Sequence, residues 1–225
     1  MISNQLLQKA AEDFRYLLNR GFPRKPSLEL VGNRYQLTSD QRHLLHRGVF
    51  SDQDSQRRKS KKIPLHRICN QELAIDGYNV LITLQAGLLG RPLVLGDDGY
   101  IRDISGLSGN FKRSKATEEA IQCILDLLKK TPPRTTLFLF DSPVSKSGEL
   151  ASEIRERMQD ELIPGDACTL HVPEKILIGF PGVVATSDTA ILDQSKKTLD
   201  LAGIILRGIG NLDSLLRLRK TTLRS

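Results

Sequence analysis

Three short apolar runs in this chain each end on an aspartate, and no other feature constrains the fold as much. The runs end at Asp76, Asp141 and Asp188. Continuous apolar runs separated by helical stretches are typical of buried parallel strands covered on both faces. The pattern therefore predicts an α/β fold with a parallel sheet flanked by helices. In such a sheet, residues just past the carboxyl ends of the strands line the ligand crevice, so we expect the three carboxylates to converge there.

Carboxylates that converge need something to balance their charge. Two of them about 5 Å apart repel by roughly 3 kcal/mol at an effective dielectric constant of about 20. A cluster therefore needs a proton or a cation, and a site made only of oxygen ligands typically binds Mg²⁺ or Mn²⁺. The alternative is that each aspartate merely ends a strand or caps the next helix. Because the pattern occurs three times, it favours an acidic metal site.

The positive charge of the chain is concentrated near its N-terminus. The 225 residues carry a net charge of +7, and residues 1–67 alone hold 14 Lys and Arg against 6 Asp and Glu. A basic front end joined to a body with an acidic crevice suits a polyanionic substrate, since Lys and Arg neutralise phosphates. A basic surface that only serves solubility is an equally good interpretation.

The sequence lacks the features of an exported or membrane protein. Its first residues have neither a basic start nor the apolar segment of a signal peptide, and its apolar stretches are far too short to span a bilayer. The cysteines Cys69, Cys123 and Cys168 are odd in number and unpaired by spacing, as in reducing compartments. We therefore expect a cytoplasmic protein with no membrane partner.

The chain divides into three parts. Residues 1–50 place apolar side chains at helical spacing between glycines and prolines, which predicts a small basic helical region. Residues 51–64 contain the run Arg57-Arg58-Lys59-Ser60-Lys61-Lys62, which indicates a charged linker or mobile loop. Residues 65–225 would form the α/β body.

Three further segments of the body carry local signals. Asp97, Asp98 and Gly99 predict the turn of a hairpin between residues 92 and 104. Residues 175–178 have the character of a strand. The basic residues near the C-terminus, around Arg217, predict a helix.

Two polar motifs at strand ends carry most of the chemistry. In Asp76-Gly77-Tyr78-Asn79, the carboxylate can ligate a metal, the glycine permits a tight turn, and Asn79 can orient a bound water or a phosphate oxygen. Thr186-Ser187-Asp188-Thr189 places a carboxylate and hydroxyls at a helix N-terminus, where backbone N–H groups favour anions. Asn79 and Ser187 are therefore candidate substrate-binding residues.

A structural zinc site is a further interpretation. The spacing of four residues would allow a zinc quartet: His43, His46, His66 and Cys69. The first two histidines flank Leu44-Leu45 on an amphipathic helix, however, where ordinary surface or core histidines are far more common than ligands.

The strand-end motifs resemble a known family. Ile75-Asp76-Gly77-Tyr78-Asn79-Val80, Phe140-Asp141 and Ala185-Thr186-Ser187-Asp188 are similar to motifs of the NYN branch of the PIN-like nucleases. The resemblance covers roughly residues 70–195 and implies a metal-dependent ribonuclease with a PIN-like parallel sheet between helices. It assigns Asp76 and Asp188 to the metal, Asn79 to the polar position beside the first, and Asp141 to the acidic end of a central strand.

The chain departs from the family pattern at two positions. The family often carries an acidic residue two positions after the last aspartate, where this chain has Ala190, and Asp193 one turn further on could substitute as a metal ligand. The family also uses a helix carboxylate, for which we favour Glu149 because it follows the Asp141 loop. Three other glutamates compete for that role: Glu118, Glu119 and Glu153. These departures leave open a degenerate site in a non-catalytic RNA- or ribonucleoprotein-binding module.

Other segments resemble a prokaryotic protein family catalogued only as being of unknown function. The similarity lies in residues 21–35 and 97–106 and implies a prokaryotic cytosolic protein, without an activity. Asp103 in the second segment is a candidate for the crevice, and Lys112 and Arg113 are candidates to hold a nucleic-acid backbone. The sequence thus predicts an Mg²⁺- or Mn²⁺-dependent nuclease acting on RNA, and leaves open whether the chain forms a homodimer.

Overall fold

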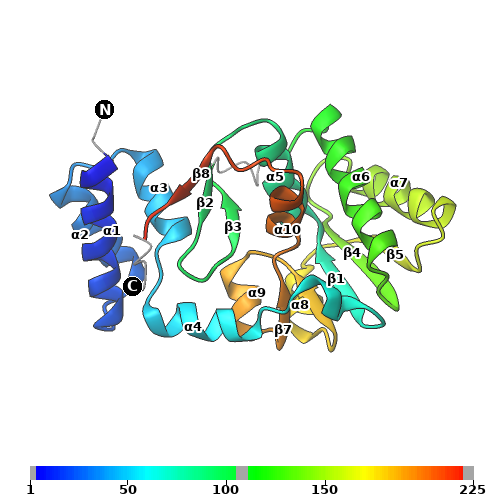
Figure 1. Ribbon diagram of the computed structural model, residues 1–225, viewed down its shortest axis with the longest axis horizontal. Coiled ribbons are helices and arrows are strands. Elements are labelled where there is room, and N and C mark those ends of the chain that lie inside the picture. Colours follow the sequence, from blue (N-terminus) through cyan, green and yellow to red (C-terminus); the bar gives the residue numbers. More distant parts are fainter. Residues whose placement is uncertain (1–3, 105–110, 220–225) are drawn as a thin grey trace.

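The computed structural model describes residues 4–104 and 111–219. Figure 1 shows a helical N-terminal region on one side, a larger sheet with its helices on the other, and a small sheet between them. The described helices are α1 (Asn4–Asn19), α2 (Arg24–Arg34), α3 (Ser39–Gly48), α4 (Asp52–Lys61), the 3-10 turn η1 (Leu65–Ile68), α5 (Gly77–Leu88), α6 (Lys115–Lys130), α7 (Ser147–Asp160), α8 (Glu174–Gly179), α9 (Thr189–Gln194) and α10 (Leu201–Gly208). The described strands are β1 (Glu72–Asp76), β2 (Leu93–Leu95), β3 (Ile101–Asp103), β4 (Thr135–Asp141), β5 (Gly165–Leu170), β6 (Val183–Ala185), β7 (Lys197–Leu199) and β8 (Leu215–Arg217).

The larger sheet has five parallel strands in the order β5-β4-β1-β6-β7. The chain builds outward from β1 to β4 and β5, and then continues on the other side of β1 with β6 and β7. β1 therefore lies where the direction of winding reverses, and this is where open α/β sheets form their ligand crevice. The sheet and its flanking helices confirm the predicted α/β class.

Alternate residues of β1 contribute to two different cores. Leu73 and Ile75 belong to the core shared with α5, α6, α7 and α10. Ala74 packs on the opposite face, in a core with Leu177 of α8 and Ile191 of α9. Because helices cover both faces, the buried side chains from Leu73 to Ile75 must all be apolar, which explains the continuous run in the sequence.

A small mixed sheet connects the N-terminal region to the body. β2 pairs antiparallel with β3 and parallel with β8. The hairpin turn lies where it was predicted, and Gly99 there has a φ of +82°, which favours glycine. The core of α1–α3, built around Phe14 and Leu45, also contains Val94 of β2 and Leu218 beyond β8. The N-terminal region and the body therefore share buried contacts.

The expected charged linker at 51–64 is instead mostly the helix α4. Ser51 begins it, since its hydroxyl accepts the backbone N–H of Asp54 at 3.0 Å. Acidic residues occupy the first turn and basic residues the last, an order that complements the helix dipole. Ser55 and Arg58 are buried against the rest of the protein. A charged run indicated an exposed loop only because its partners lie far away in the sequence.

Two other segment predictions were wrong. Residues 175–178 lie within α8, which starts directly after Pro173. The chain near Arg217 forms β8 rather than a helix, because β2 offers a strand edge to pair with. Within residues 4–104 and 111–219, none of the helices combines the length and the apolar character needed to cross a bilayer.

Candidate functional site

A cleft of about 710 Å³ opens at the carboxyl edge of the parallel sheet. Asp76, Asp141 and Asp188 all line it, because they follow the adjacent strands β1, β4 and β6. Asp76 is in register with Leu139, two residues before Asp141. The convergence of the three predicted carboxylates is therefore a direct consequence of the strand order. We refer to this hollow as the cleft.

Asp76 lies at the floor of the cleft in a partly buried position. Its Oδ2 accepts a hydrogen bond of 2.7 Å from the hydroxyl of Thr186. The pKa of Asp76 is raised to about 7: burial is the largest cause, the negative charges of Asp188 and Asp141 add to it, and the hydrogen bond from Thr186 acts against them. The carboxyl group therefore titrates near neutral pH, because burial disfavours its charged form.

Asp141 lies near an acidic residue that was not among the predicted site residues. Glu174, the first residue of α8, lines the same cleft. Burial raises the pKa of Asp141, and the charge of Glu174 acts in the same direction. A proline followed by an acidic residue is a helix-start signal, and Pro173-Glu174 was obscured because residues 175–178 had the character of a strand.

Asp188 has a structural function besides its place in the cleft. Its Oδ1 accepts the backbone N–H groups of Ala190 and Ile191, at 2.8 and 3.2 Å, and so caps α9. The alternative interpretation, that such an aspartate caps the next helix, is therefore correct for this residue. Capping and cleft lining coexist here because both capping bonds use the same oxygen atom, Oδ1.

Asn79 and Ser187 fix the two strand-end motifs to each other. The side-chain oxygen of Asn79 accepts both the backbone N–H and the hydroxyl of Ser187, at 2.8 and 2.9 Å. Asn79 lines the cleft as predicted. Gly77 is required for a reason other than turn geometry: a Cβ there would come within 2.2 Å of the ring of Phe140. Close packing, rather than backbone freedom, explains the glycine.

The N-terminal region supplies one wall of the cleft, which the sequence did not predict. His43 and Arg47 of α3 line it, together with Asp103 at the end of β3. Arg47 donates to the backbone oxygen and to Oδ1 of Asp103, at 3.2 and 3.1 Å. The prediction that Asp103 faces the crevice is consistent with this position. Helical spacing alone gave no sign that α3 would reach the sheet.

Three predicted site residues lie in a neighbouring hollow of about 910 Å³. It contains Lys112, Arg113 and Glu149, and it shares Tyr78 and Val144 with the lining of the cleft. Glu149 is thus not brought among the three aspartates, because α7 runs away from the strand end. Of the competing glutamates, Glu118 and Glu153 bind Arg113 instead.

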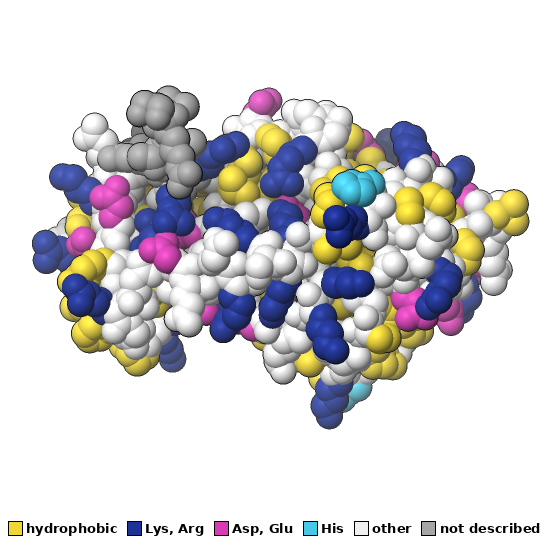
Figure 2. All heavy atoms as spheres, turned by 60° about the horizontal axis from the view of Figure 1, so that its bottom comes forward, with side chains coloured by type: hydrophobic (Ala, Val, Ile, Leu, Met, Phe, Trp, Pro, Cys, Tyr) yellow, Lys and Arg dark blue, Asp and Glu magenta, His cyan; other side chains and the backbone are white. Residues whose placement is uncertain are grey.

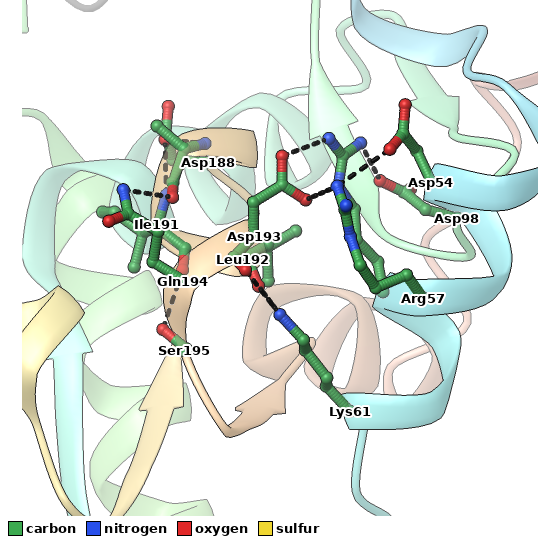
Figure 3. Close-up of polar contacts among 12 residues, drawn as sticks. Asp54, Arg57, Lys61, Asp98, Asp188, Ile191, Leu192, Asp193, Gln194 and Ser195 are labelled. Atoms are coloured by element: carbon green, nitrogen blue, oxygen red, sulfur yellow. Dashed lines mark hydrogen bonds and ion pairs between the residues drawn. The ribbon is translucent and has the colours of Figure 1, made fainter.

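Asp193 is placed on the wrong side of α9 for the predicted metal role. It accepts two hydrogen bonds of 2.8 Å from Arg58 and one of 3.1 Å from Arg57. Figure 3 shows Asp193 turned toward Arg57 of α4, apart from Asp188 at the beginning of α9. Its pKa is lowered: burial acts to raise it, but the hydrogen bond from Arg58 and the arginine charges prevail.

Most of the basic run of α4 is used within the protein. Besides the two arginines, Lys61 donates to the backbone oxygens of Leu192 and Asp193, and Lys62 donates to Asp200 at 3.0 Å. Figure 2 nevertheless shows many Lys and Arg side chains on the face of the molecule where α4 runs. The basic run therefore mainly joins α4 to the body through hydrogen bonds and ion pairs, and it contributes less to the surface charge.

The cleft offers donors of the kind that Mg²⁺ or Mn²⁺ takes. Its carboxylates are all oxygen ligands, and the raised pKa of Asp76 reflects its burial near two other carboxylates. Among the described residues, no three His, Cys, Asp or Glu side chains already form a group that would hold a metal ion. Mg²⁺ usually keeps several waters and takes one or two carboxylates with substrate phosphates, so the donor set still fits it. The zinc quartet, by contrast, is not assembled in this part of the chain.

Fold and cleft together define an α/β domain with an acidic crevice at its topological switch point. Residues 65–204 match a family described as "Domain of unknown function (DUF5616)", and residues 6–61 match "Protein of unknown function (DUF434)". An uncharacterized protein of Methanocaldococcus jannaschii is 36% identical over 202 residues, which cover 87% of this chain and 94% of the relative. The chain therefore belongs to the DUF5616 family. No solved structure matches it significantly.

Proposed function

We propose that this protein is a metal-dependent ribonuclease that hydrolyses phosphodiester bonds in the cleft. The observation that carries the proposal is the convergence of Asp76, Asp141 and Asp188 in one cleft at the switch point of a parallel sheet. The raised pKa of Asp76 adds a reason why this cluster would attract a cation. The motifs that resemble the NYN branch of the PIN-like nucleases agree with the proposal.

Each cleft residue has a task in the proposed reaction. Asp76, Asp141 and Asp188 would hold Mg²⁺ or Mn²⁺, and the bound ion would supply Lewis-acid chemistry for phosphodiester hydrolysis. Asn79, fixed by Ser187, would orient a water or a phosphate oxygen with its amide group. Glu174 would add negative charge beside Asp141 and so support binding of a cation.

The neighbouring hollow would hold the RNA backbone. Lys112 is exposed there, and its ammonium group would contact phosphates without first breaking an ion pair in the described residues. Arg113 already binds Glu118 and Glu153, so its contribution to RNA binding would be smaller.

The three cysteines are unpaired, which supports the proposed cytoplasmic location. A homodimer stays a prediction that sedimentation velocity would test.

The decisive experiment is a divalent-metal titration on a panel of RNA and DNA oligonucleotides. We expect the wild-type protein to cleave RNA with Mg²⁺ or Mn²⁺, and Asp76→Asn and Asp188→Asn each to abolish cleavage. The amide keeps the shape of the carboxylate but loses the charge that holds the cation. RNA binding should be unchanged or slightly tighter, since the cleft loses negative charge.

Asp160→Asn provides the matched control, because Asp160 is an exposed aspartate at the end of α7 and outside the cleft. It should cleave as well as the wild-type protein. Asp76→Asn and Asp188→Asn proteins that also cleave normally would place the active site elsewhere and end the proposal.

A non-catalytic RNA- or ribonucleoprotein-binding module is the second candidate. Ala190 favours it, since this residue lines the cleft where the resembled family often has a carboxylate. A wild-type protein that binds RNA but cleaves nothing with Mg²⁺, Mn²⁺ or Co²⁺ would support this alternative. Ala190→Asp would then be the variant to make, because it restores the missing oxygen ligand.

A further inference from the structure

Two basic residues of α3 face the acidic cleft from the N-terminal region. His43 and Arg47 are four positions apart, so they lie on the same face of the helix. α3 is seated closely on the small sheet: a Cβ at Gly48 would come within 2.6 Å of Val94. The position of both side chains is therefore set by the packing of the helix.

These two residues are basic, whereas the other ionisable groups named in the cleft are acidic. Five of its lining residues are acidic: Asp76, Asp103, Asp141, Glu174 and Asp188. His43 and Arg47 are the only basic residues among the described residues that line it. A phosphate entering the cleft would meet repulsion from the carboxylates and find a hydrogen-bond donor with positive charge only on the α3 wall.

Arg47 is held in place before any ligand arrives. Its Nε and Nη2 donate to Asp103, and its side chain is 25% exposed. Its Nη1 makes no hydrogen bond to the residues that the structure describes. The planar guanidinium is thus fixed at one edge and keeps a donor for a ligand, and this geometry suits an oxygen of a phosphate group.

We infer that His43 and Arg47 form a phosphate-binding subsite on the α3 wall of the cleft. The ligand is a phosphodiester group of single-stranded RNA, which the α3 wall would hold while the other face of the phosphate meets the acidic side. This inference rests on the proposed function for the identity of the ligand. It makes the N-terminal region part of the substrate site rather than an appendage.

The test is equilibrium binding of a fluorescent single-stranded RNA oligonucleotide in Ca²⁺, measured over a range of salt concentrations. Each phosphate contact contributes about 0.7 to the slope of log affinity against log salt for single strands. We expect Arg47→Gln to weaken binding about tenfold and to lower that slope by about one contact. His43→Gln should weaken binding less, because an imidazole ring lacks the planar multi-donor fork of a guanidinium group.

Two further variants separate recognition from folding. Arg34→Gln removes the same charge from an exposed position of the N-terminal region outside the cleft, and it should change neither affinity nor slope. Arg47→Lys keeps the charge but loses the fork to Asp103, so it should restore the slope. A purely structural role for Arg47 would not produce this difference. If Arg47→Gln does not fold, His43→Gln and Arg47→Lys still carry the test.

The outcomes distinguish this inference from the proposed function. An Arg47→Gln protein with the wild-type affinity and slope overturns the subsite, as does a wild-type protein that binds no RNA. A wild-type protein that binds through Arg47 but never cleaves keeps the subsite and removes the nuclease. If the wild-type protein cleaves RNA with metal and Arg47→Gln leaves KM unchanged, the proposed nuclease is kept and the subsite is overturned.

Discussion

Two clusters of charged side chains differ in how their carboxylates are balanced. Where the N-terminal region meets the body, two aspartates bind arginines from α1, α4 and β3. We call these five residues the arginine joint: Arg15, Arg58, Asp97, Asp98 and Arg102. In the cleft, by contrast, five carboxylates line one hollow, and among the described residues only His43 and Arg47 of α3 bring basic side chains to it.

Asp98 and Asp76 show what this difference does to two carboxyl groups that both lose solvent. Burial acts to raise the pKa of Asp98, but Arg102 binds it through two bonds of 2.8 Å, and with Arg58 it lowers that pKa overall. Asp76 has a hydroxyl as its partner instead, and its pKa is raised to about 7. Pairing with arginine, rather than depth, thus separates a structural acid from a candidate functional one.

The two clusters are nevertheless connected. Arg102 donates from Nε to the backbone oxygen of Ser187 at 2.8 Å, directly before Asp188. Arg58 and Arg102 also stack on the ring of Phe50, with distances of 4.6 and 5.0 Å to its centroid. The arginine joint therefore supports the backbone that presents one of the cleft carboxylates. Deleting the whole N-terminal region would take Arg15 and Phe50 away from these arginines and aspartates, so point variants are the better probes.

The largest effect should come from breaking the arginine joint at Asp98. Its side chain is fully buried, and Asp98→Asn would leave Arg58 and Arg102 with reduced compensation. We expect the free energy of unfolding to fall by about 3–5 kcal/mol, as for other buried pairs that lose one partner. Chemical denaturation would measure this, with the exposed Asp126→Asn as the control. A loss below about 1 kcal/mol would mean that the joint is not a structural unit.

At Asp76, in contrast, we expect a substitution to raise the free energy of unfolding of the metal-free protein. Its pKa is about 7 in the folded state and near 3.8 unfolded, so the folded state holds the proton more tightly between these values. Stability should therefore fall as the pH rises through this window and stay low above it. Asp76→Asn removes that titration and should stabilise the protein by about 2–4 kcal/mol at pH 8.

The check for Asp76 is a pair of unfolding curves in EDTA. The difference between Asp76→Asn and the wild-type protein should shrink steadily as the pH falls from 8 to about 4, and it should approach zero near pH 3, where the carboxyl group is mostly protonated in both the folded and the unfolded state. A difference that is the same at pH 4 and pH 8 would show that the pKa of Asp76 is ordinary.

A smaller effect should follow from adding metal. Mg²⁺ or Mn²⁺ at about a hundred times its dissociation constant should stabilise the wild-type protein by about 2.7 kcal/mol, since a ligand that binds only the folded state adds this amount. Asp76→Asn and Asp188→Asn should each reduce the rise in melting temperature, whereas Asp160→Asn should keep it. Equal rises in all four proteins would indicate a metal bound outside the cleft.

The smallest effect is predicted for Asp193, which sequence spacing had offered as a metal ligand. Its side chain is 30% exposed, and Arg58 keeps Asp98 as a second partner. Asp193→Asn should therefore cost about 1 kcal/mol in the free energy of unfolding. The response of the melting temperature to Mn²⁺ should stay as in the wild-type protein. A lost response would return Asp193 to the metal site.

The parts of the fold that could be predicted are those with a local cause. The run before Asp76 had to be apolar because helices cover both faces of β1, and that requirement is visible in the sequence. Glu149 and Asp193 could not be placed in the same way. Which side of a helix faces the crevice depends on how the helix packs, and α9 turns Asp193 to α4.

The ion pairs could not be predicted from local sequence patterns either. Arg15 and Asp97 are 82 positions apart, and Arg58 and Asp193 are 135 apart. The basic front end of the chain therefore suggested a surface for polyanions, although several of its cations bind aspartates of the body. Composition counts charges, but only their positions in space say which of them are already neutralised.

The sequence by itself determined the parallel sheet and the aspartates at its carboxyl edge. The hydrophobic pattern of a strand and the residue at which the strand ends both depend on neighbouring residues. Only the tertiary structure decided that α3 would carry His43 and Arg47 to that edge, and that Glu174 would join them. Packing between distant segments, such as Val94 of β2 against the helices of the N-terminal region, sets these positions. Such contacts depend on the whole chain, so no local pattern contains them.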